Sequence, residues 1–61
     1  MNKSEALRKA ALLRIAEQEA RIARQKDVIA HLNAIGASIV PAQHLLTVME
    51  DTLKTLRTSL S

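Results

Sequence analysis

The sequence predicts an all-α fold: a two-helix antiparallel hairpin that assembles into a four-helix bundle as a dimer. The 61 residues hold only one Gly and one Pro, and most of the others are strong helix formers. Apolar residues recur at alternating spacings of three and four, the pattern of coiled-coil helices. The chain also lacks Cys and aromatic residues, so association is the expected source of stability.

The first helix is expected over residues 4–35. Asn2 is a suitable N-cap, and Glu5 follows it three residues later, as in a capping box. An Ile-Ala pair then recurs three times with a period of seven residues. The stripe that we expect to face a partner helix consists of Ala11, Ile15, Gln18, Ile22, Gln25, Ile29 and Leu32.

Gln18 and Gln25 interrupt this stripe, and two interpretations of them are open. In the first, both amides are buried, hydrogen-bonded, and set the register or the choice of partner. In the second, the helix is rotated slightly, so that a row formed by Ala16, Ala23 and Ala30 faces inward beside the isoleucines. The glutamines then lie at the rim, and this is the interpretation that we favour.

A turn is expected over residues 36–40, because Gly36 and Pro41 suit a helix end and a helix start. Val40 precedes Pro41 and is expected to be extended. The second helix is expected over residues 41–59, so that residues 1–61 form a single helical hairpin. Its stripe consists of Ala42, Leu46, Met49, Leu53, Leu56 and Leu60.

The two predicted helices differ in length, at roughly 48 Å and 28 Å. The second would cover the first only down to about Ile15 or Ala16, leaving an apolar, basic overhang. We therefore expect a second copy or a partner helix to complete the cover. The function that this predicts is that of a small interaction or regulatory protein working through helix–helix association. The residues expected at the oligomer or partner interface are Leu7, Ala11, Leu12, Ile15, Gln18, Ile22, Gln25, Ile29, Leu32, Leu46, Met49, Leu53, Leu56 and Leu60.

The net charge of +3 comes entirely from the first half of the chain. A basic helix can contact phosphate groups, so the alternative function is that of a nucleic-acid-associated regulator. Interspersed acidic residues and the absence of aromatic residues for base stacking count against it. The residues that would make these contacts are Arg8, Lys9, Arg14, Arg21 and Arg24.

Enzymatic function is not expected, because two thin helices without an aromatic wall or a Gly-rich loop provide little pocket for catalysis. His31 and His44 alone are a weak ligand set, so neither a metal nor another cofactor is expected. No apolar run approaches the roughly 20 residues of a membrane helix, and the first residues do not resemble a secretory signal. We expect no membrane partner, no small-molecule substrate and a cytoplasmic location.

One longer pattern begins with Arg21-Ile22-Ala23-Arg24-Gln25 and continues with Ile29, Leu32, Gly36, Ala42, Leu45-Leu46, Met49-Glu50 and Leu53. This pattern resembles a group of short uncharacterised proteins of alpha-proteobacteria, over roughly residues 14–57. The resemblance implies a helical hairpin of bacterial cytoplasmic origin, and it implies no activity. The chain departs from the group at residues 39–41, where the group more often has polar capping residues.

Overall fold

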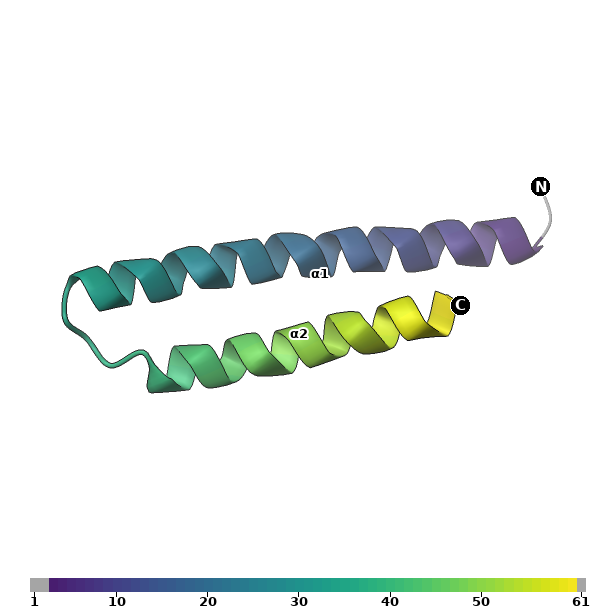
Figure 1. The fold of residues 1–61 in the computed structure, drawn as a ribbon. Helices are drawn as coiled ribbons and strands as arrows, with labels where there is room; N and C mark the ends of the chain where they lie inside the picture. Colours follow the sequence, from purple (N-terminus) through teal and green to yellow (C-terminus); the bar gives the residue numbers. More distant parts are fainter. Residues whose placement is uncertain (1–2, 61) are drawn as a thin grey trace.

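The computed structural model describes residues 3–60, which form two helices joined by one short connection (Figure 1). Helix α1 runs Lys3–Ala34 and helix α2 runs Val40–Leu60. The helices lie antiparallel and side by side in a rod of 52 × 15 × 11 Å. The predicted all-α, two-helix hairpin is therefore confirmed. Asn2, the expected N-cap, lies outside the described residues.

The end of α1 is closed by a Schellman motif built on Gly36. The N–H of Ala37 donates to the Leu32 carbonyl at 2.9 Å, and the N–H of Gly36 donates to the Asn33 carbonyl at 3.2 Å. Gly36 has a φ of 76°, a left-handed conformation that only Gly adopts without strain. A Cβ there would meet nothing within 4 Å, so backbone conformation rather than crowding explains the Gly.

Helix α2 begins one residue earlier than the sequence predicts. The Ile39 carbonyl accepts from the N–H of Gln43 at 2.8 Å, which makes Ile39 the N-cap and Val40 the first helical residue. The expectation that Val40 is extended is therefore wrong. Pro41 fits at the second position, because the first N–H groups of a helix have no partner inside it. The earlier start also places half-buried Ile39 on the α2 stripe, three residues before Ala42.

The two helices meet along one seam. Every residue of the two predicted stripes is buried or half-buried, and Ile39 joins them at the start of α2. All other described residues are exposed. The seam therefore packs α1 against α2 within a single chain. Its members are Ala11, Ile15, Gln18, Ile22, Gln25, Ile29 and Leu32 on the first helix and Ile39, Ala42, Leu46, Met49, Leu53, Leu56 and Leu60 on the second.

Helix α2 covers a longer part of α1 than the sequence predicts. Covered positions on α1 run from Leu32 down to Ala11, whereas the prediction ended the cover near Ile15 or Ala16. That prediction is wrong because the seam already begins at Ile39 and because α2 has 21 residues instead of 19. An overhang is still present, and it consists of the first eight described residues of α1, 3–10.

Candidate interaction surfaces

Two glutamines cross the seam and bond to the backbone of the opposite helix. Gln18, only 9% exposed, donates from Nε2 to the Met49 carbonyl at 2.9 Å. Gln25 donates from Nε2 to the Ala42 carbonyl, also at 2.9 Å. Gln25 follows Gln18 by seven residues and Ala42 precedes Met49 by seven, so both bonds repeat one antiparallel register.

The rotated-helix interpretation of these glutamines is therefore wrong. Both side chains lie in the seam, and the row of Ala16, Ala23 and Ala30 is exposed. Within residues 3–60, no buried side-chain nitrogen or oxygen lacks a hydrogen-bond partner. The amides are thus satisfied by carbonyls, as the interpretation of buried amides requires. Every helical residue has a backbone carbonyl. If α2 slid along α1, both glutamines could therefore find new acceptors, and these bonds alone do not fix the register.

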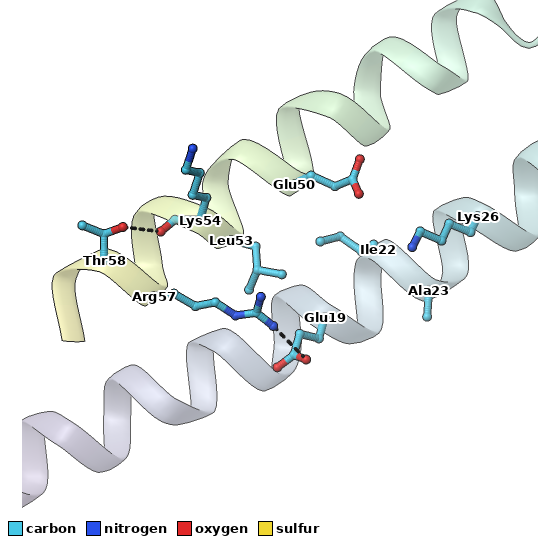
Figure 2. A pocket seen from close by; sticks show the side chains of 9 residues that line it. All are labelled: Glu19, Ile22, Ala23, Lys26, Glu50, Leu53, Lys54, Arg57 and Thr58. Carbon is cyan, nitrogen blue, oxygen red and sulfur yellow. Dashed lines mark hydrogen bonds and ion pairs between the residues drawn. The ribbon is translucent and has the colours of Figure 1, made fainter. Parts of the chain in front are cut away.

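Charged residues beside the seam discriminate between registers. Arg57 and Glu19 form an ion pair at 3.4 Å, and both side chains are more than half exposed. One heptad nearer the turn, Lys26 and Glu50 line the same groove from opposite helices, with the signs exchanged (Figure 2). A slip of one heptad would place Glu19 opposite Glu50, or Lys26 opposite Arg57. Each exposed pair contributes at most about 1 kcal/mol, but the exchanged signs penalise the slipped pairings.

These four charged residues surround a hollow in the surface of the hairpin. It is an open groove of about 640 Å³ with Ile22 and Leu53 between the helices (Figure 2). The groove is walled by Glu19, Ala23, Lys26, Glu50, Lys54, Arg57 and Thr58. Cationic and anionic side chains from both helices line it. Its chemistry suits contact with another charged surface.

The hairpin buries little and exposes much apolar surface. Ile15 and Ile22 are its only buried hydrophobic residues within the described chain. Leu7 and Leu12, expected at an oligomer or partner interface, are exposed, Leu7 to 68%. The other large hydrophobic residues that are 46–70% exposed are Leu13, Val28, Ile35, Val40, Leu45 and Val48. They lie outside the two stripes named above, although the positions of Leu45 and Val48 widen the second stripe.

The five basic residues proposed for nucleic-acid contact do not share one face. Arg14 and Arg21 lie one heptad apart and line a small hollow together with Glu17. Arg24 lies on the same side of α1, because it follows Arg21 by three residues. At about 100° per residue, Arg8 lies about 120–160° around the helix from these three residues, and Lys9 lies about 120–140° from Arg14 and Arg21 but about 60° from Arg24. The structure thus brings together three of the five residues.

Among residues 3–60, no group of three or more His, Cys, Asp and Glu side chains is placed to hold a metal ion. Neither α1 nor α2 has a stretch that is long and apolar enough to cross a membrane.

Comparisons of the chain with protein-family models, with curated proteins and with solved structures find no match.

Proposed function

We propose that the chain is a small non-enzymatic interaction protein that works through helix–helix association, and that two hairpins form a dimeric four-helix assembly. The observation that carries the proposal is the imbalance of apolar surface. Among residues 3–60, two hydrophobic residues are buried, while eight large ones stand 46–70% exposed. Helices derive most of their stability from packing, so a hairpin that buries this little gains from packing against a second copy. A bacterial cytoplasmic setting belongs to the same proposal.

Self-association predicts that stability depends on protein concentration. Because a dimer that dissociates on unfolding is favoured by mass action, the melting temperature should rise as the concentration increases from micromolar to millimolar. Circular dichroism at 222 nm follows the melting, and sedimentation equilibrium gives the mass. Interference optics are needed, because the chain has no aromatic residue to absorb at 280 nm. A constant melting temperature together with a mass of 6.7 kDa throughout would contradict the proposal.

The alternative function, a nucleic-acid-associated regulator, is supported by the shared face of Arg14, Arg21 and Arg24. If this face binds phosphates, R14Q/R21Q should weaken binding to a fluorescent DNA duplex and reduce the salt slope by about two. Arg8→Gln, on another face of α1, is the matched control and should have a much smaller effect. Fluorescence anisotropy at low salt measures both variants, and an absence of binding to duplex and single strand would dispose of this alternative.

A further inference from the structure

The side of α1 that points away from α2 carries a second heptad pattern, which we call the outer face. Its spacing alternates between three and four residues, and every member is exposed. At about 100° per residue, this face lies roughly 150° around the helix from the seam. The outer face consists of Ala6, Lys9, Leu13, Ala16, Ala20, Ala23, Asp27, Ala30 and Ala34.

The apolar members of the outer face do not determine which partner binds there, but its two charged residues do. Lys9 and Asp27 are the only ionisable groups on the face, and each stands nine residues from position 18. If a second α1 lies antiparallel with its centre at the same position, Lys9 of each copy meets Asp27 of the other. Two identical ion pairs then form across a two-fold axis, as an isologous interface requires.

The same register matches the rest of the outer face. Leu13 and Ala23 each stand five residues from position 18, so the exposed Leu13 side chain meets a small residue of the other copy. Ala16 meets Ala20, each two residues from that centre. Leu13 is 61% exposed in the single hairpin, and this contact would cover it. Alternation of large and small side chains is the arrangement that lets two helix surfaces interdigitate.

Other pairings of two outer faces are less favourable. A parallel pairing places Lys9 beside Lys9 and Asp27 beside Asp27 of the other copy. An antiparallel pairing that slips by one heptad leaves Lys9 facing Ala20 or Ala34 instead of a carboxylate. Like charges in contact oppose association, and an unpaired charge gains nothing from it. Charge complementarity therefore selects one orientation and one register.

Residues beside the outer face form a second pair of opposite charges in this register. Within the hairpin, Glu19 and Arg57 each follow a seam residue by one position, and they form the observed ion pair. Glu17 and Arg24 follow Ala16 and Ala23 in the same way, so the same geometry places Glu17 of one copy opposite Arg24 of the other. On the other side of the outer face, the Glu19 side chains of the two copies lie near the two-fold axis and therefore near each other. Each of them already has Arg57 of its own chain as a counter-ion.

We propose that a second copy of this chain docks antiparallel on the outer face, through two Lys9–Asp27 pairs and the contacts of Leu13 with Ala23. This inference rests on the proposed self-association and assigns it to one face. Both α1 helices then lie in the middle and both α2 helices lie outside. The dimer is an open four-helix layer, because the outer face and the seam lie on nearly opposite sides of α1.

The first test is charge exchange in the full chain, read by sedimentation equilibrium. Lys9→Asp or Asp27→Lys alone places like charges at two positions of the interface, and each should weaken dimerisation by tenfold or more. The double variant K9D/D27K should recover the wild-type affinity. An equimolar mixture of the two single variants should form a heterodimer, since one copy then presents only acids and the other only bases. Asp51→Lys, an exposed change of the same type on α2 outside the groove, should leave the affinity unchanged.

The second test is a zero-length carbodiimide cross-link in the wild-type protein. Lys9 and Asp27 lie 18 residues apart on one helix, about 27 Å, so a bond between them joins two copies. The linked peptide should appear in the dimer band and vanish in Lys9→Gln. A wild-type dimer that lacks this link and is unaffected by both charge reversals would overturn the assignment of the face while leaving the proposed self-association standing. A wild type that stays monomeric would overturn both.

Discussion

Ile22→Asp is expected to abolish the helical fold. Ile22 is 7% exposed and lies between the helices near Leu53. The substitution removes a branched apolar side chain and leaves a carboxylate in the seam without a partner. The combined cost is about 4 kcal/mol or more, comparable to the whole stability of a chain this small. Circular dichroism at 222 nm should show the loss of most helical signal at 25 °C.

Val28→Asp is the matched control for this substitution. Val28 is also β-branched and lies on the same helix, but it is 46% exposed, so the new carboxylate keeps its water. We expect nearly wild-type helicity from it. If Ile22→Asp kept wild-type circular dichroism and mass, the seam described above would not be what holds the hairpin together.

Gln18→Glu is expected to make stability depend on pH. The two side chains have nearly the same shape, but an ionised carboxylate cannot donate to the Met49 carbonyl. At pH 7 the variant should lose about 2–3 kcal/mol of unfolding free energy, because a buried charge faces an acceptor. Burial raises the pKa of the introduced carboxyl above its ordinary value of about 4.3. The unfolding free energy that the variant lacks at pH 7 is therefore fully recovered when the pH is below the ordinary pKa. It is lost again as the pH rises through the raised pKa of the folded state.

Urea unfolding of variant and wild type between pH 3 and pH 8 measures this difference. Gln43→Glu is the control, because Gln43 is exposed in the first turn of α2, where the helix dipole favours the charged form of a carboxyl. Its stability relative to wild type should rise slightly with pH, opposite in sign to that of Gln18→Glu. A flat profile for Gln18→Glu would mean that the amide does not depend on its bond to Met49.

Much of the fold follows from the sequence, because heptad spacing reports which side chains lie on one face of a helix. Both stripes could be derived by counting from Ile15 and Leu46, and each of their members is covered. The position of Gly36 likewise marks the end of α1. These features depend on local spacing and backbone conformation, which a single sequence contains.

The environment of the glutamines could not be derived in the same way. A polar residue in a stripe can lie at a rim or inside a seam, and the acceptors of Gln18 and Gln25 are backbone carbonyls that leave no mark in the sequence. The extent of the cover also depends on how Ile39 packs, which spacing alone does not report. The inward placement of the alanine row is wrong for a related reason. Ala16 and Ala23 follow the same period of seven as the isoleucines, so only side-chain size distinguishes the outer face from the seam.

The rod shape of the hairpin has a consequence for hydrodynamic measurements. Its radius of gyration is 15.0 Å, whereas a compact globule of the same chain length would have roughly 10 Å and one of twice that length roughly 14 Å. A single hairpin therefore elutes from a gel-filtration column earlier than a compact protein of its mass. Elution volume alone would overstate the mass, so light scattering or sedimentation equilibrium has to decide the stoichiometry.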